Sequence, residues 1–503
     1  MKMSIRKRLL VLIVLCSVAM LAFTGLLNNV KSVSAEPIVA ESSEFYMEEG
    51  AQVRTAPEEM GIRFKATITE DYWQSLLVEY GEDATYSFYS IVTDGTTPIK
   101  KSYVNLTPNF LESETYELFS TIIYNTQQLE DAGKLDAARS LKLSAKTYID
   151  VTKAGEDTPV TITAYGETGY CSMRAIANDF ALQGLEDEEL MKYIVVGNRS
   201  EQVEGYIFAD NSGIIEMAAL PDLSQATDME VYFGTKMLEA TYENGKISFN
   251  GVVLEEGQTQ AYISVFTGGK VYSSKVALAT KITQANVADL LKLNGHETVY
   301  LAENIDLSDY SEWISNVEFT GTFDGGNHTI DCLTIPTNGT AGFYPGFFKT
   351  IQGTVKNVAF TNVWLKGNCA VLGGGLSGKL TVSNVFIQVT KASGAYRTSL
   401  IVERVTSPYL LEIEDVVATM PGTANVQKVF GYCFNNATAN LKNFYGIGIG
   451  TDLNSPYATS GGSGIINKDN VNFYTNLDGF NSATKTLTDF LTSCVATYLN
   501  ANA

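Results

Sequence analysis

The fold of this chain is decided by two short segments, Thr354-Val355-Lys356-Asn357-Val358 and Thr381-Val382-Ser383-Asn384-Val385, which are copies of one pattern. Three further segments follow the pattern less strictly: Thr329-Ile330-Asp331-Cys332-Leu333, Glu412-Ile413-Glu414-Asp415-Val416 and Asn440-Leu441-Lys442-Asn443-Phe444. The fourth positions of the five segments recur after 25, 27, 31 and 28 residues. A period of roughly 20–50 residues is typical of a stacked repeat.

The spacing of the apolar residues indicates what kind of repeat this is. Val355, Val358 and Phe360 step by three across the fourth position and then by two. Strand side chains alternate with a period of two, so a step of three indicates an extra residue at a corner, where Asn or Asp tolerates left-handed backbone. The pattern predicts a right-handed parallel β-helix over residues 284–484. Its corners should stack as a side-chain ladder, in which we expect Asn384 to be buried: Asn357, Asn384, Asp415 and Asn443.

A known repeat shares these residues. The stretch from Gly321 to Ile330, GTFDGGNHTI, and the later Gly353-Thr354-Val355-Lys356-Asn357-Val358 resemble GLUG-type β-helical repeats of bacterial adhesin-like surface proteins. The order of Gly326 and Asn327 is reversed relative to that pattern, and Lys349 replaces a glycine. The resemblance implies a β-helix and a surface location, and it names no ligand.

The first part of the chain, residues 36–200, is expected to be an α+β domain. Residues 70–80 and 112–135 have helical spacing, whereas residues 62–68 alternate as a half-buried strand does. The stretches GAQVR at 50–54, GIRFKA at 61–66 and LSAKTYIDV at 143–151 resemble an uncharacterised module of secreted proteins of gut Firmicutes. That resemblance supplies a location and no reaction.

Two smaller parts complete a mainly β, multidomain organisation. Residues 201–283 contain short strands separated by turn signals, which predicts a small Ig-like β-sandwich acting as a spacer. A ligand-binding role for this sandwich is the alternative. Residues 485–503 have helical spacing and are expected to cap the open end of the β-helix.

The amino terminus predicts export. Residues 1–35 contain five basic residues and no acidic one, then an apolar run, and they end in Val33-Ser34-Ala35. This is the order of a cleaved signal peptide, with an uncleaved anchor as the alternative. We therefore expect an extracellular or cell-surface protein without a membrane span after cleavage. The net charge of −21 makes nucleic acid a poor partner.

The sequence offers little that could carry out catalysis. The two histidines, His296 and His328, are 32 residues apart and belong to no catalytic motif, and His328 is interpreted as a structural hydrogen-bonding residue. Asp306 and Asp309 fit a solvated turn better than a cation site, and the cysteines form neither a zinc motif nor a disulfide framework. We expect no catalytic residue, metal or cofactor.

Aromatic side chains are the remaining candidates for ligand binding. Tyr344, Trp364 and Tyr396 lie within the repeat region, where flat rings can stack on sugars or can fill the core instead. The sequence therefore predicts a non-enzymatic, adhesin-like protein that binds an extracellular glycan or a surface protein. A polysaccharide lyase or hydrolase on the β-helix is the alternative, although the paired carboxylates and local signatures of such enzymes are not recognisable.

Overall fold

The computed structural model is mainly β and falls into two compact units. Unit 1 comprises residues up to 200, 228–238 and 264–271, and unit 2 comprises the rest. The structure describes residues 38–501 except the following: 42, 55–60, 125, 186–191, 194–198, 201–203, 217–228, 244, 268–269, 338–344, 394–397, 406–407, 421–426, 435–436, 450–464 and 477–478. The predicted signal peptide, residues 1–35, lies outside the described residues.

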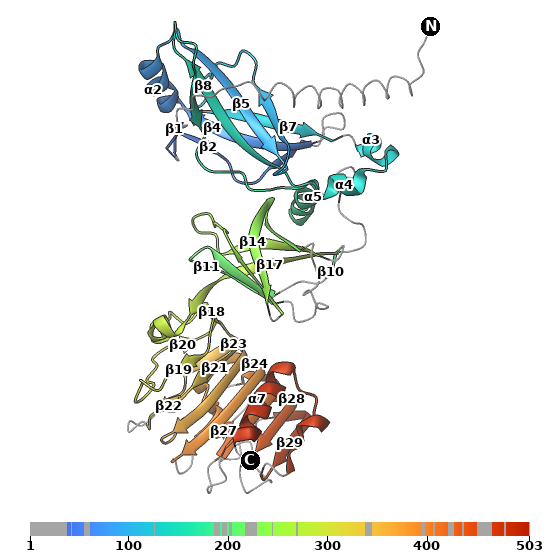
Figure 1. Cartoon of the computed structure of the whole chain (residues 1–503). Helices are drawn as coiled ribbons and strands as arrows, with labels where there is room; N and C mark the ends of the chain where they lie inside the picture. The colour runs from blue at the N-terminus through green and yellow to red at the C-terminus, as the bar shows by residue number, and fades with distance from the viewer. Residues whose placement is uncertain are drawn as a thin grey trace. The chain divides into compact units, whose positions relative to one another are not determined.

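The described residues of unit 1 contain two sheets, four short helices, and strands β10 and β13, which belong to neither of these sheets (Figure 1). The five-stranded sheet has the order β1-β9-β8-β5-β6, and in the second sheet β4 pairs with β2, β3 and β7. The bounds are β1 Ile38–Val39, β2 Phe45–Met47, β3 Gln52–Arg54, β4 Gly61–Thr69, α2 Glu70–Tyr80, β5 Thr85–Thr93, β6 Pro98–Ser102, β7 Thr115–Ile123, α3 Thr126–Asp131, α4 Leu135–Arg139, β8 Ser144–Thr152, β9 Val160–Thr163, α5 Met173–Leu182, β10 Arg199–Ser200 and β13 Glu230–Phe233.

Helix α2 forms where the sequence predicted it. The Thr69 hydroxyl caps its first turn by accepting a hydrogen bond from the Tyr72 backbone, and Trp73, Leu76 and Tyr80 are buried. The helix predicted over residues 112–135 is wrong for its first part, because β7 pairs with β4 along its whole length, whereas α3 is helical within its second part. The burial of β7 alternates, with Leu118 and Ser120 inward, so strand pairing overrides the helical spacing of this segment.

The residues predicted to form a separate sandwich are divided between the two units. Strand β13 and parts of β14 and β16 belong to unit 1, whereas β11, β12 and β15 belong to unit 2. In unit 2, β15 pairs antiparallel with both β12 and β14. The bounds are β11 Glu204–Phe208, β12 Ser212–Glu216, β14 Lys236–Glu243, β15 Lys246–Asn250, β16 Gln260–Thr267 and β17 Lys270–Ile282.

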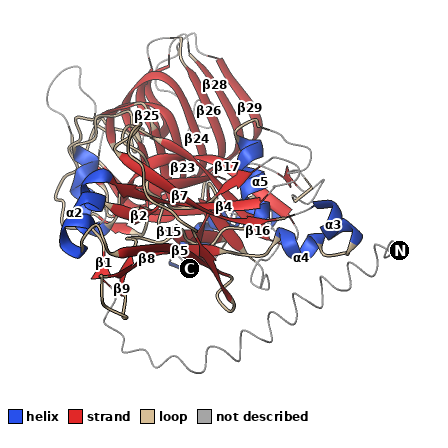
Figure 2. Ribbon diagram, turned by 90° about the horizontal axis from the view of Figure 1, so that it is seen from above, coloured by secondary structure: helices blue, strands red, loops and turns tan. Residues whose placement is uncertain are grey.

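The rest of unit 2 is a parallel β-solenoid, in which each coil pairs in register with the next. Figure 2 shows β23, β24, β26, β28 and β29 side by side. The bounds are η3 Gln284–Leu291, β18 Thr298–Leu301, β19 Ile305–Asp306, β20 Glu318–Phe319, β21 Thr322–Asp331, β22 Thr334–Ile335, β23 Phe348–Leu365, β24 Gly373–Ala392, β25 Thr398–Val405, β26 Leu410–Thr419, β27 Gln427–Phe434, β28 Thr438–Ile447, β29 Ile465–Tyr474, η5 Ser482–Thr484 and α7 Asp489–Ala501.

The solenoid core consists of apolar side chains stacked in columns. Val355, Val382, Ile413 and Leu441 occupy equivalent positions in successive coils, and all four are buried. A buried aliphatic side chain of this size stabilises a fold by about 1.5–3 kcal/mol. Because a coil buries these side chains only against its neighbours, the column holds consecutive coils together.

Helix α7 lies against the side of the solenoid, where it contacts β24 and β26 (Figure 1). Its Leu491 and Val495 are fully buried in a cluster with Phe386, Val417 and Tyr445. The prediction that this segment caps the open end is therefore wrong. The helix covers a column of outward apolar side chains that would otherwise be exposed to water, and β29 pairs only with β28 among the described strands.

Candidate functional site

The predicted ladder residues form one column at a corner of the solenoid. Asn357, Asn384, Asp415 and Asn443 all have left-handed backbone, with φ between 50° and 54°. Asn384 donates to Asn357 at 2.8 Å between Nδ2 and Oδ1, and Asn443 donates in the same way to Asp415 at 2.8 Å. All four are half-buried, so the expectation that Asn384 is buried is wrong. The column leaves the edges of these side chains open to water.

The first predicted repeat was assigned to the wrong residues. His328 pairs with Val358, which places Asn327 beneath Asn357, and Asn327 also has a positive φ of 62°. Cys332 stands at a second corner next to Asn362, and these two residues have φ of 60° and 51°. The step of three around Cys332 is real, but it marks a different bend of the coil. At its other end, the column continues to Asn470, whose amide donates to Asn443 at 2.8 Å.

The strand before each corner presents a polar face. The residues one and three positions before the corner point outward, while the residue between them belongs to the buried column. A groove of about 490 Å³ lies on this face. Its lining comprises Thr381, Ser383, Glu412, Ile413, Glu414, Asn440, Leu441, Lys442, Asn467, Lys468 and Asp469. We call this surface the polar face.

Hydrogen bonds link the polar face from coil to coil. The Asn440 amide donates to both Glu412 carboxylate oxygens, at 3.1 and 3.2 Å, and the Asn467 amide donates to Asn440 at 2.8 Å. Glu414 and Lys442 form an ion pair in which both side chains stay about half exposed. Polar side chains at equivalent positions therefore recur along the stack at about 4.8 Å, the separation of paired strands. Sequence reasoning missed this face, although the fixed distance of each residue from its corner was a signal that could have revealed it.

A cluster of charged side chains lies at the first coil of unit 2. Asp324 is fully buried and accepts from the Tyr206 hydroxyl at 2.7 Å, the Gly326 backbone at 2.9 Å and the Asn357 amide at 3.1 Å. The Lys356 ammonium lies 3.4 Å from Asp324 and also pairs with Glu204. Lys356 is therefore held among carboxylates and belongs to this cluster.

Glu216 completes the cluster with an unusual pKa. Burial raises the pKa of Glu216 to about 7, and the charge of Asp324 adds to this effect, whereas Lys246 and Lys356 oppose it. Oxygens of Glu204, Glu216 and Asp324 lie within 4.8 Å of one another, close to the separation of the two carboxyls in retaining glycosidases, about 5–5.5 Å. Asp324 is fully buried, however, and Lys356 supplies the positive charge that a metal would bring. The arrangement suits a structural ion network.

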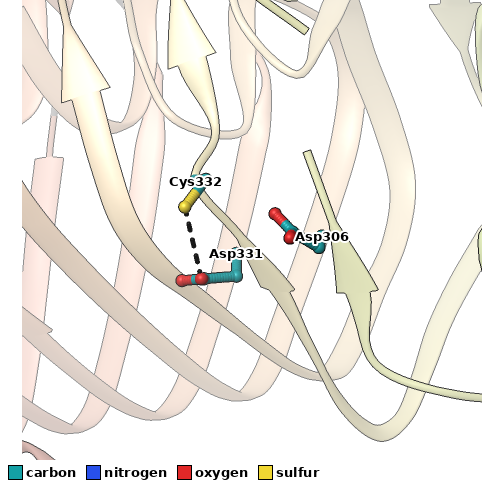
Figure 3. A group of neighbouring side chains, drawn as sticks. All are labelled: Asp306, Asp331 and Cys332. Carbon is teal, nitrogen blue, oxygen red and sulfur yellow. Dashed lines mark hydrogen bonds between the residues drawn. The ribbon is translucent and has the colours of Figure 1, made fainter. Parts of the chain in front are cut away.

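A second acidic group lies at the other corner of the first coils. Figure 3 shows Asp306, Asp331 and Cys332, whose ligand atoms lie within 4.8 Å of one another. Asp331 accepts from Thr361 at 2.6 Å, from Asn362 at 2.7 Å and from the Cys332 thiol at 3.3 Å. Burial and Asp331 raise the pKa of the Cys332 thiol to about 11, which keeps it protonated at neutral pH. These partners explain the group as a hydrogen-bonded corner.

One of the three predicted aromatic ligand-binding residues lies in the described part of the chain. Trp364 is half-buried, and the ammonium groups of Lys391 and Lys366 lie 4.0 and 4.5 Å from its ring centroid. Its ring is therefore already in cation–π contact. Tyr344 and Tyr396 lie outside the described residues.

The remaining candidates have ordinary surroundings, apart from His328. His296 bonds to the Thr320 hydroxyl at 2.6 Å. The His328 ring makes no hydrogen bond within the described part of the chain, in contrast to its predicted structural role. Burial lowers the pKa of His328 to about 4 and leaves the ring neutral at pH 7. The four cysteines with described side chains are free thiols: Cys171, Cys332, Cys369 and Cys494.

Comparisons with known proteins add little to this geometry. No family model matches the chain, and no curated protein matches it significantly. One solved structure, the crystal structure of the I9–I11 tandem from titin, is similar at 7% identity with a TM-score of 0.12. The match covers 46% of this chain and 65% of the titin chain, and a similarity this low carries no argument. No helix in the described residues is long and apolar enough to cross a membrane.

Proposed function

We propose that this protein is exported and binds an extended, hydroxyl-rich glycan along the polar face of its solenoid. Export rests on the signal-like residues 1–35. The adhesin-like role, the right-handed sense of the β-helix and the surface location rest on the resemblance of residues 321–358 to GLUG-type repeats. The observation that carries the binding proposal is the groove lined by polar side chains of successive coils.

The repetition of the polar face suits a polymer. A glycan lying along the stack meets hydroxyls on β24, carboxylates on β26 and amides on β28 and β29, and all three groups bond readily to sugar hydroxyls. The groove mixes acidic side chains with Lys442 and Lys468, so it does not select strongly for one sign of charge. Helix α7 covers the column that contains Phe386 and Val417, which leaves the polar face as the exposed one of these two surfaces.

The proposal predicts that binding depends on the Glu414–Lys442 pair. The double variant Glu414→Ala/Lys442→Ala leaves the net charge unchanged and removes an exposed ion pair, which contributes little to stability because water screens it. We expect it to lose at least tenfold in affinity for any polysaccharide that the mature protein binds on a glycan array, as measured by surface plasmon resonance.

The matched control removes another exposed ion pair of unit 2. Asp289 and Lys292 pair at 2.9 Å and do not line the groove. Asp289→Ala/Lys292→Ala should therefore bind like the wild type. Equal affinity in all three proteins would refute the polar face as the binding site. Unsaturated or reducing-end products released from a polysaccharide would favour the lyase or hydrolase alternative.

A further inference from the structure

A second hollow lies in unit 2 and shares no lining residue with the groove of the polar face. Its volume is about 630 Å³, within the range of roughly 300–1,000 Å³ that is typical of small-molecule sites. Residues of β12, β14 and β15 form one wall, and residues 326–328 of β21, at a register shift in that strand, contribute to the other. We call it the junction hollow.

Two glycines allow backbone of the junction hollow to pack closely against aromatic rings. A side-chain carbon on Gly213 would come within 2.3 Å of the Phe249 ring. Gly326 has a φ of +56°, and a side-chain carbon there would lie 2.7 Å from the Tyr300 hydroxyl. Glycine at both positions therefore allows backbone to approach these aromatic rings, which are fully buried. The apolar part of the wall that remains accessible comes from Ile214 and Ala302.

The walls also carry polar groups that are available to a ligand. Ser248 and Asn250 are exposed on β15, and His328 faces the same hollow from the first coil. The neutral His328 ring has one donor and one acceptor, and neither is used within the described residues. Hydroxyl, amide and imidazole groups of this kind pair with ligand hydroxyls.

The charges of the junction hollow disfavour an ionic ligand. The Lys246 ammonium lies 3.7 Å from Glu216 and 3.1 Å from the Tyr300 hydroxyl, and Lys281 pairs with Asp210 at 3.2 Å. Each ammonium therefore already has an acidic partner. The exposed Glu243 carboxylate, which also lines the hollow, would repel an anion.

We infer that the junction hollow binds an uncharged saccharide unit, separately from the polar face. Ser248, Asn250 and His328 hydrogen-bond its hydroxyls, and the wall at Ile214 and Ala302 contacts its apolar carbon atoms. A site of this size holds a single sugar ring or a short oligosaccharide. It differs from the polar face, which follows the solenoid over several coils.

Titration of the full chain with neutral monosaccharides (glucose, galactose, mannose and N-acetylglucosamine) and with glucuronate tests this inference by calorimetry. We expect at least one neutral sugar to bind at millimolar concentration. Ser248→Trp, which fills the hollow from an exposed position, and His328→Ala should each weaken binding at least tenfold. Gln260→Trp, the matched control, places the same side chain at an exposed position of unit 2 outside the hollow and should bind within about twofold of the wild type.

Three results would overturn the inference: no neutral sugar binds, Ser248→Trp binds normally, or glucuronate binds more tightly than the neutral sugars. The variant Glu414→Ala/Lys442→Ala separates the two sites. It should retain monosaccharide binding even where polysaccharide binding is lost. A failure at the polar face is thereby distinguished from a failure at the junction hollow.

Discussion

Asn384 performs two tasks that substitution can separate. Its left-handed backbone disfavours a side chain such as Ala by about 1 kcal/mol, and its amide bonds to Asn357 and to the Thr488 hydroxyl. We expect Asn384→Ala to lower the free energy of unfolding by about 2 kcal/mol. Asn384→Gly, which tolerates this backbone, should lose only about 1 kcal/mol. Urea denaturation measures both values, and an Ala variant as stable as the wild type would contradict the ladder.

Glu216 should make stability depend on pH. Its pKa is about 7 in the folded protein and near 4.5 in the unfolded chain, so the folded state binds its proton more tightly. The stabilisation is complete below about pH 4.5 and is lost as pH rises toward 7, by up to about 3 kcal/mol. Glu216→Gln cannot ionise at this position. The free energy of unfolding of the variant minus that of the wild type should therefore be larger at pH 8 than at pH 4.5.

The opposite titration of His328 is present in both proteins and cancels in that comparison. Its pKa of about 4 lies below the ordinary value of 6.5, so its contribution is lost as pH falls. Thermal unfolding from pH 4.5 to pH 8 measures the difference between the wild type and Glu216→Gln. A difference that stays constant with pH would show that Glu216 titrates normally.

At the scale of elements, α7 stabilises the side of the solenoid. Leu491 is fully buried against the cluster that contains Phe386 and Val417. Leu491→Ala should lower the free energy of unfolding by about 2–4 kcal/mol, because it removes buried apolar contacts and leaves a cavity. The exposed Thr492→Ala on the same helix serves as the control and should change stability by less than about 0.5 kcal/mol. Equal melting temperatures for the two variants would show that the helix does not contribute.

At the scale of the whole molecule, the solenoid could be predicted from the sequence because its corners require left-handed backbone. Asn and Asp tolerate that backbone, so they recur in the sequence at regular intervals. The first coil could not be assigned in this way, since Cys332 bends the chain at a second corner with the same apolar step. The surface on which α7 packs could not be predicted, because helical spacing identifies an apolar stripe on the helix but not the surface that this stripe contacts.

The candidate sites were harder to predict than the fold. Asp324 and Lys356 lie in the recognisable repeat, but their partners Glu204 and Glu216 come from strands more than a hundred residues earlier. No local pattern joins such distant residues. The polar face, in contrast, follows directly from the period, once the positions before each corner are compared with one another.

Strand β29 has a consequence for how such a chain can change in length. It pairs only with β28 among the described strands, and its residues are polar or exposed along most of their length. In a solenoid each coil packs only against its neighbouring coils. A duplicated coil can therefore be added without changing a core that all coils share. Gene duplication of one 27- to 31-residue unit would therefore lengthen this molecule, and each copy would bring its own portion of the ligand-facing surface.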